Sequence, residues 1–194
     1  MKLKESQTLS NLLKAFAGES QARNRYSYFA SVARKEGFEQ ISAIFLETAE
    51  NEKEHAKIFF EHMQSINGEM IDITAGYPAG KIGTTAQNLL EAADGEKLEY
   101  STLYPEFEKV ARREGFKEIA DSFKEIGEVE AQHEKRYRKL LENVKSGKVF
   151  KKDNVRTKWK CRNCGYVHEG ISAPKTCPAC KHPQAHYEVL CENY

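Results

Sequence analysis

The chain has 194 residues and nearly balanced charge, with 30 Lys plus Arg against 29 Asp plus Glu. That length accommodates one ordinary domain and a small second one, and the balance excludes a net field that would attract nucleic acid or an anionic membrane. The first ten residues, MKLKESQTLS, are polar rather than signal-like, and no apolar run approaches the length of a bilayer span. We therefore expect a soluble intracellular protein that binds neither nucleic acid nor membrane.

An internal repeat organises the first three quarters of the sequence. Residues 29–38 read FASVARKEGF, and residues 107–116 read FEKVARREGF. The same shift of 78 residues superposes two Glu-x-x-His motifs. Such self-similarity predicts two copies of a two-helix unit.

The two motifs, Glu52 with His55 and Glu130 with His133, lie within apolar stripes. Apolar residues recur at spacings of three and four on both sides of each motif, so these polar side chains share the helix face that should be buried. A buried carboxylate is protonated, ion-paired or metal-bound, because leaving it unpaired costs several kcal/mol. An ion pair would explain one motif, but two at equivalent positions favour a metal site.

The helix before each motif supplies one further carboxylate, Glu19 in the first half and Glu96 in the second. Each follows a glycine. These Gly-Glu pairs match at a shift of 77 residues, whereas the rest of the repeat matches at 78, so the later helix holds one extra residue after Glu96. Because Pro105 removes a backbone donor nearby, we predict a local wide turn in that helix.

Four helices thus each contribute a carboxylate, and two also contribute a histidine, which is the pattern of a carboxylate-bridged two-metal site in a four-helix bundle. Such an oxygen-rich donor set favours iron or manganese. Tyr26 lies two helical turns after Glu19 on the same helix face, and Tyr104 lies two turns after Glu96 on its face. There each phenol is equally compatible with a hydrogen bond to a ligand carboxylate or with plain aromatic packing. We interpret His62 as a core or solvent-reaching histidine.

We expect four helices, near residues 7–36, 39–66, 86–114 and 117–146. A glycine after each one predicts a left-handed cap: Gly37, Gly68, Gly115 and Gly147. Short turns make the first two helices antiparallel, and likewise the last two. Residues 67–85 are too long for a tight turn and predict the long crossover of a ferritin-like bundle. Gly18 and Gly95 immediately precede predicted ligands. We interpret them as room for close packing beside the metals, and tolerated weak spots in the helices are the alternative.

The last fifth of the chain holds all five cysteines. Two Cys-x-x-Cys pairs predict a tetrahedral four-sulfur metal site rather than disulfides: Cys161, Cys164, Cys177 and Cys180. Iron and zinc both suit such a site, and the sequence alone makes zinc the default, although the 12 residues between Cys164 and Cys177 are slightly fewer than in common zinc sites. Cys191 is left over and is expected to be a packed or partly exposed thiol. The expected domains are a bundle over residues 1–147, a charged linker over 148–157 and a small metal domain over 158–194.

A two-metal carboxylate site beside a one-metal thiolate site indicates redox chemistry. A ferrous pair stores the two electrons needed to cleave a peroxide O–O bond, and an iron–thiolate centre could refill it one electron at a time. Zinc could not, because it has no redox chemistry.

Nearly the whole chain resembles the rubrerythrin family. The resemblance is carried by AFAGESQARNRY in the first helix, GEKLEY in the third and the two Glu-x-x-His motifs, followed by a tail (WKCRNCGY, then APKTCPAC) similar to a shortened rubredoxin. It implies a mainly α, ferritin-like bundle with a di-iron site and a rubredoxin-like Fe(Cys)4 domain. It also implies a cytoplasmic non-haem peroxidase that reduces hydrogen peroxide and protects against oxidative stress.

The resemblance further implies the roles of the ligands. Glu52 and Glu130 would bridge the two irons. The remaining ligands would divide between them: Glu96 and His133 for one iron, and Glu19 with either Glu99 or His55 for the other. Glu99, whose counterpart in the first half is Ala22, would exchange with His55 on reduction, because a neutral imidazole suits the less positive ferrous ion.

The family also implies a head-to-tail homodimer or a tetramer, with electrons from a rubredoxin or an NAD(P)H-dependent reductase. The chain itself shows no Gly-rich dinucleotide fingerprint. Two alternatives stay open. One is a ferritin-like ferroxidase or iron-handling protein, which leaves the cysteine tail without a purpose. The other is a peroxide-sensing module with a structural zinc ribbon.

Overall fold

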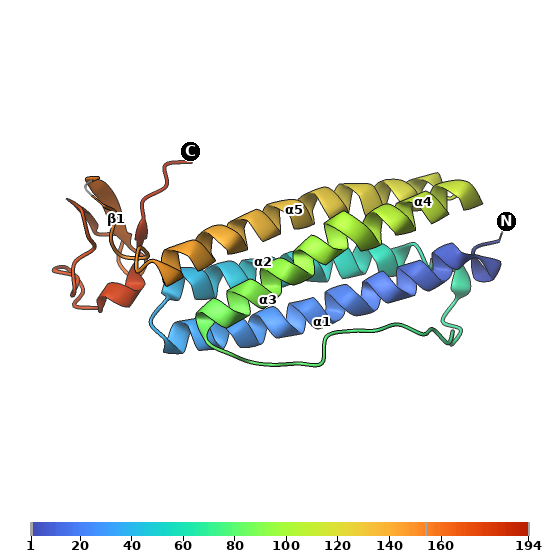
Figure 1. Cartoon of the computed structure of the whole chain (residues 1–194), viewed down its shortest axis with the longest axis horizontal. Coiled ribbons are helices and arrows are strands. Elements are labelled where there is room, and N and C mark those ends of the chain that lie inside the picture. The colour runs from blue at the N-terminus through green and yellow to red at the C-terminus, as the bar shows by residue number, and fades with distance from the viewer. Residues whose placement is uncertain (1, 154, 194) are drawn as a thin grey trace.

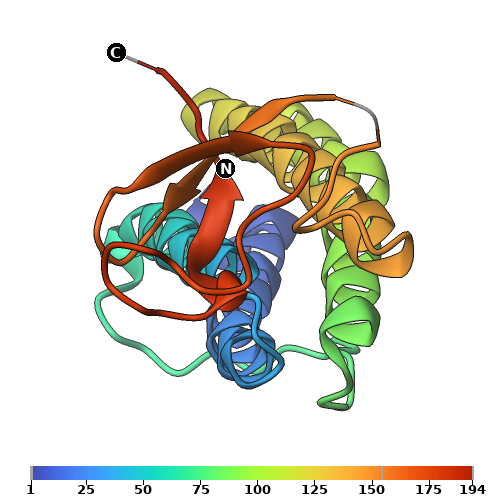
Figure 2. The ribbon, with the colours of Figure 1, turned by 90° about the vertical axis from the view of Figure 1, so that its left-hand side faces the viewer.

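The computed structural model describes residues 2–153 and 155–193, so Met1, Asn154 and Tyr194 of the predicted domains and linker lie outside the described residues. Four long helical segments form a bundle, and a small strand domain lies at one end of it (Figure 1). The view along the bundle shows this domain lying across the helix ends (Figure 2). The helices are α1 (Gln7–Lys35), α2 (Glu39–Glu61), α3 (Thr85–Leu98), α4 (Tyr104–Glu114) and α5 (Lys117–Lys145).

The predicted wide turn is confirmed. A π-helix, η3 (Glu99–Leu103), joins α3 to α4, and the amide of Tyr104 donates to the carbonyl of Glu99, five residues earlier. The wider ring absorbs the extra residue that the repeat revealed. Pro105 follows in the first turn of α4, where its missing N–H is tolerated.

The second helix ends earlier than predicted. His62 caps α2 after Glu61, and the chain continues into a 3-10 turn, η2 (Gln64–Ile66). Met63 and Ile66 remain buried through this turn. Because a 3-10 helix also brings residues three apart onto one face, the apolar spacing continues past the α-helix and led to the late prediction.

The predicted left-handed glycines follow α1, α4 and α5, at Gly37, Gly115 and Gly147, with φ between 67° and 89°. Gly68 also has positive φ, but it does not cap α2, because that helix ends at Glu61. The crossover then leaves the bundle and runs along α1 without regular structure until Thr84 caps α3 (Figure 1). Thr84 and Gln87 form a reciprocal capping box. Among the described residues, none of the helices has the length and apolar character needed to cross a membrane.

The bundle core consists of two aromatic clusters related by the sequence repeat. In one, the rings of Tyr26 and Tyr137 meet edge to face with centroids 5.5 Å apart. In the other, the repeat-equivalent rings of Tyr104 and Phe59 do the same at 5.7 Å. The duplicated sequence therefore builds a pseudo-twofold core, and the polar motifs lie between its halves.

The tail is a three-stranded antiparallel sheet in the order β2-β1-β3. Its strands are β1 (Thr157–Cys161), β2 (Val167–Gly170) and β3 (Tyr187–Val189), with a 3-10 turn, η4 (Gln184–His186), before β3. Trp159 and Tyr187 are fully buried in its core.

Part of the predicted linker belongs structurally to the tail. The amide of Lys152 donates to the carbonyl of Ile171 at 2.8 Å, and Phe150 packs on the tail core. The ring of Phe150 also stacks on Phe38 at the α1–α2 turn, with centroids 6.1 Å apart. The aperiodic, charged composition of this segment gave no sign of these contacts.

Candidate metal centres

Helices α1, α2, α3 and α5 bring the four predicted carboxylates into the middle of the bundle. Glu19, Glu52, Glu96 and Glu130 are each no more than 1% exposed. Their donor atoms and those of the two histidines form two groups, each within 4.8 Å: Glu19, Glu52, His55 and Glu130 in one, and Glu52, Glu96, Glu130 and His133 in the other. Glu52 and Glu130 belong to both groups, which is the arrangement that bridging carboxylates require.

The donor atoms converge without satisfying one another, and this tests whether a metal fits. Nδ1 of His133 lies 2.8 Å from Glu130 Oε2 and 3.3 Å from Glu52 Oε1. Within the described residues, none of these three buried atoms has a hydrogen-bond partner of acceptable geometry. The same holds for one oxygen each of Glu19 and Glu96. Buried polar atoms that lack hydrogen-bond partners and lie around the same point are suited to bind metal ions. The mixture of carboxylate and imidazole donors suits iron.

Without a metal, the cluster is electrostatically strained. Burial, followed by the neighbouring carboxylates, raises the pKa of Glu19 and Glu96 well above the usual value. Burial lowers the pKa of His133, but Glu130 and Glu52 more than compensate and raise it to about 12. These shifts show that protons would occupy the cluster when cations do not, so metal binding must release protons.

The two predicted tyrosines hydrogen-bond ligand carboxylates, but each serves the opposite half of the repeat. Tyr26 on α1 donates to Oε1 of Glu96 on α3 at 2.7 Å. Tyr104 at the start of α4 donates to Oε1 of Glu19 on α1. Both phenols are buried, so each hydrogen bond orients a carboxylate inside the core.

Glu99 lies beside the metal-donor groups rather than within them. It is absent from both groups of converging donor atoms in the described chain. Its Oε1 is 3.8 Å from the point where a Cβ on Gly18 would lie. Burial, followed by the charge of Glu96, raises the pKa of the Glu99 carboxyl well above its usual value. The structure therefore brings His55, not Glu99, into contact with the shared carboxylates.

The interpretation of Gly18 and Gly95 as sites of close packing is wrong. A Cβ at Gly95 would meet nothing within 4 Å, and one at Gly18 would make only ordinary contacts. Each glycine costs roughly 1 kcal/mol relative to Ala inside a helix. The space beside them is open because both residues line a cavity.

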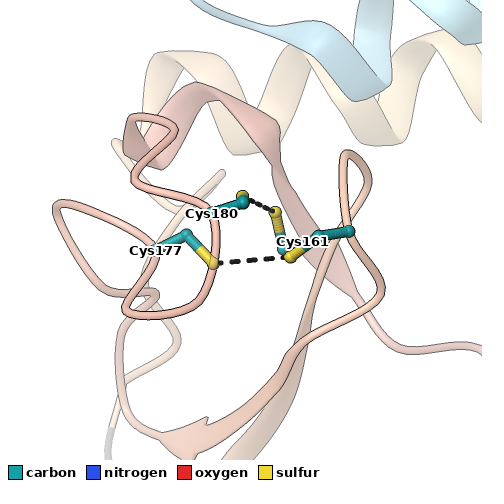
Figure 3. Close-up of side chains that lie close together, drawn as sticks. Cys161, Cys177 and Cys180 are labelled. Carbon is teal, nitrogen blue, oxygen red and sulfur yellow. Dashed lines mark hydrogen bonds between the residues drawn. The ribbon is translucent and has the colours of Figure 1, made fainter.

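The four predicted cysteines of the tail form the second centre. Figure 3 shows the side chains of Cys161, Cys177 and Cys180 turned toward one another. Sulfur atoms lie 3.7 Å apart in the Cys161–Cys180 and Cys164–Cys177 pairs. A regular tetrahedron with metal–sulfur bonds of about 2.3 Å has edges of about 3.8 Å, so one metal ion fits the set.

The two cysteine loops are near-copies of each other. The residue after the second cysteine has positive φ in both, 80° at Gly165 and 64° at Lys181. Its amide donates to the carbonyl of the first cysteine, at 2.8 Å for Gly165 and 2.9 Å for Lys181. The amide of His182 donates to the sulfur of Cys180, whose pKa is lowered to about 5. Such donors favour the thiolate form that binds metal.

Comparison with known proteins agrees with both centres. Residues 10–141 match the rubrerythrin family, and residues 159–188 match the rubredoxin-like domain of rubrerythrin. The chain belongs to the rubrerythrin family. Rubrerythrin of Porphyromonas gingivalis is 56% identical to it, over 99% of this chain and 94% of that protein. Rubrerythrin of Nitratidesulfovibrio vulgaris is 53% identical, over 99% and 98%.

Solved structures agree with the fold. Fully reduced nigerythrin, described as all ferrous, superposes with a TM-score of 0.64 at 29% identity, covering 96% of this chain and 90% of that one. Desulfovibrio desulfuricans bacterioferritin gives a TM-score of 0.65 at 23% identity, covering 73% and 82%, and this likeness concerns the fold alone. The predicted fold class and the predicted cofactors, a di-iron pair and one thiolate-bound iron, are thereby confirmed for a rubrerythrin-family chain.

Some residues around the centres carry no sequence signal. Tyr77 on the crossover donates to the carbonyl of Lys14 at 2.9 Å and lies close to Gly18. Arg25 on α1 lowers the pKa of Glu99, although burial outweighs it. Tyr77 lies outside the repeat, so neither periodicity nor motif spacing pointed to it. His62, by contrast, accepts or donates a 2.8 Å hydrogen bond with Ser122, away from the donor groups.

Proposed function

We propose that this rubrerythrin-family protein is a peroxidase that reduces hydrogen peroxide to water in the cytoplasm and protects against oxidative stress. One observation carries the proposal: two groups of buried donor atoms share Glu52 and Glu130, in a chain that also gathers four thiols around one point. A ferrous pair in the first site would supply two electrons for cleavage of the O–O bond, and two protons complete the formation of two waters.

The side chains around the carboxylate site position and adjust its ligands. Tyr26 and Tyr104 each bind one carboxylate oxygen, so the orientations of Glu96 and Glu19 are fixed while each keeps one buried oxygen without a hydrogen-bond partner among the described residues. Glu99 stands next to the site with a raised pKa and an open cavity at its side. This placement supports its role as the carboxylate that exchanges with the imidazole of His55 between redox states.

Electron delivery from the tail within one chain would cover a long distance. The tail contacts the α1–α2 turn through Phe38, while Glu52 lies thirteen residues along α2, about 20 Å at 1.5 Å per residue. Electron transfer slows steeply with distance. This separation supports a head-to-tail homodimer, alone or within a tetramer, in which the tail of one chain serves the carboxylate site of its partner.

The electron source is a separate protein. A rubredoxin or an NAD(P)H-dependent reductase would pass electrons one at a time to the thiolate iron, and that centre would refill the carboxylate-bound pair in two steps. The four cysteines are partly accessible for this transfer, because Cys164 is exposed and Cys180 half-buried.

The alternative function is ferroxidase or iron handling, which the ferritin-like bundle also favours. Turnover with hydrogen peroxide, a rubredoxin and its reductase tests the choice in the iron-loaded protein. Sustained peroxide-dependent oxidation of NAD(P)H, lost in Cys161→Ser and Glu130→Ala, is expected for a peroxidase. Iron uptake without peroxide turnover, together with assembly into a large cage on size-exclusion chromatography, would support iron handling instead.

A further inference from the structure

A cavity of about 460 Å³ lies between α1, the α3–α4 segment and the crossover. It is far larger than hydrogen peroxide needs, since two water molecules occupy roughly 60 Å³ in the liquid. Its size falls in the range of pockets that enclose organic ligands. The cavity therefore has room for a substrate that carries an organic group.

One part of this cavity lies beside the carboxylate site, at residues next to its donor groups. Gly18, Gly95, Glu99 and Tyr104 all line it. A side chain at either glycine would occupy this part, which is otherwise open. A small reactive group in the cavity can therefore lie at Glu99, beside the carboxylate centre.

The outer walls have a different character. They are mainly apolar and come from both the bundle and the crossover: Ala15, Leu98, Leu103, Phe107, Ala75 and Pro78. Lys14 and Arg25 add basic groups to the lining, and Glu99 and Glu106 add carboxyl groups. Mainly apolar walls with a few polar groups suit a molecule with an apolar body and a small polar head.

The crossover covers one side of the cavity. Thr74, Ala75, Gly76 and Pro78 are exposed on their outer side while lining the cavity, and Tyr77 is half-buried. Between Met70 and Ile82, the hydrogen bond from Tyr77 to Lys14 ties this segment to the bundle.

We propose that the cavity binds organic hydroperoxides, with the hydroperoxide group at Glu99 and the organic group against Leu103, Phe107 and Ala75. This assignment rests on the proposed peroxidase function and extends its substrate class. The O–O bond of ROOH breaks and, with two protons, ROH and water form. The two electrons would come from a ferrous pair held by the carboxylate site, and the external one-electron donor would restore them through the tail.

The test compares cumene hydroperoxide with hydrogen peroxide in the iron-loaded protein. Ala75→Trp places a large ring in the cavity, whereas Ala79→Trp adds the same ring at an exposed crossover residue outside its lining. We expect the ratio of kcat/KM for cumene hydroperoxide to kcat/KM for hydrogen peroxide to fall about tenfold or more in Ala75→Trp. The ratio should keep its parental value in Ala79→Trp.

A binding measurement removes the dependence on turnover. Cumyl alcohol, the product of the reaction, is added to zinc-loaded protein, which is redox-silent, and saturation transfer from protein to ligand is followed by NMR. Transfer in the parent and in Ala79→Trp, lost in Ala75→Trp, is the expected result. Equal transfer in all three proteins, or none, would overturn the assignment.

The outcomes distinguish failure of the proposed peroxidase function from failure of the organic-hydroperoxide assignment. Turnover of hydrogen peroxide without turnover of cumene hydroperoxide would overturn the organic-substrate assignment and leave the proposed peroxidase intact. Turnover of neither peroxide would overturn the proposed function and this assignment with it. An unchanged substrate ratio in Ala75→Trp would show that organic hydroperoxides react without using the cavity, which also contradicts the assignment.

Discussion

The phenol of Tyr26 on α1 donates a 2.7 Å hydrogen bond to the carboxylate of Glu96 on α3, seventy residues away. Tyr104 makes the reciprocal bond from the second half of the repeat to Glu19 in the first. Each half of the duplicated chain therefore orients a carboxylate of the other. The two-helix units are tied together at the site as well as through their apolar faces.

Replacing Tyr26 by Phe tests this link. The change leaves one buried oxygen of Glu96 without a donor, so we expect the protein to lose about 1–3 kcal/mol of stability and to bind iron less tightly. Chemical denaturation and metal titration measure the two effects. Tyr137→Phe is the matched control, because Tyr137 is equally buried, its hydroxyl has no hydrogen-bond partner among the described residues, and it corresponds to Phe59 in the repeat. Equal losses in both variants would contradict the proposed link.

Glu99→Ala tests the proposed exchange with His55. Because Glu99 lies outside both groups of converging donors, we expect the variant to retain iron while its oxidised-state absorption spectrum and its peroxide turnover change. The exposed neighbour of the first motif, Glu54→Ala, provides the control. An oxidised spectrum identical to that of the parent would count against the exchange.

Mixing two inactive variants tests electron transfer between chains. Cys161→Ser removes a thiolate ligand, and Glu130→Ala removes a shared carboxylate, so each homodimer should lack turnover. A refolded or exchanged mixture forms heterodimers in which one intact tail faces one intact carboxylate site of the partner. We expect activity to return in the mixture. If it stays absent although heterodimers form, transfer occurs within a chain.

The metal-free bundle should lose stability as pH rises above neutrality. Burial lowers the pKa of His55, but Glu130 and Glu52, each 2.9 Å from Nδ1, raise it to about 9. Glu19 lies at 3.9 Å from the same atom. A raised folded-state pKa stabilises the fold below the unfolded value of 6.5, and this contribution disappears as pH rises to about 9.

The expected change in unfolding free energy of the metal-free protein between those pH values is about 1–3 kcal/mol. Metal ions replace the protons, so the iron-loaded or zinc-loaded protein should show a much smaller slope. Denaturant unfolding across this pH range measures both forms, with His55→Gln as the control that removes the titrating group. A flat profile for the metal-free parent would show that His55 is not stabilised as a cation.

Much of this site could be predicted because metal-binding side chains occupy positions that the helix period assigns to the buried face. Glu52 and His55 break an apolar stripe, and the repeat shows the same break again at Glu130 and His133. The extra residue in the third helix revealed the π-helix for the same reason: the repeat supplied an internal reference for the expected length.

Other features depend on tertiary geometry that periodicity does not encode. The spacing of Tyr26 from Glu19 suggested a partner on the same helix face, yet the phenol donates to Glu96 on α3. The cavity beside Gly95 exists because the crossover lies over α1 and α3, a placement that its irregular sequence leaves unspecified. Lys181 adopts positive φ where the other cysteine loop uses glycine, which only the loop geometry shows.

The most direct measurement is a single anaerobic turnover. The iron-loaded protein is fully reduced and mixed with one equivalent of hydrogen peroxide, and the visible spectrum is followed beside metal analysis. The account predicts about three irons per chain, from the two shared-carboxylate positions and the four-sulfur position, with rapid return of the iron–thiolate absorption. A colourless protein with zinc in the four-cysteine site even after growth with iron, or slow reoxidation of a fully iron-loaded protein, would contradict it.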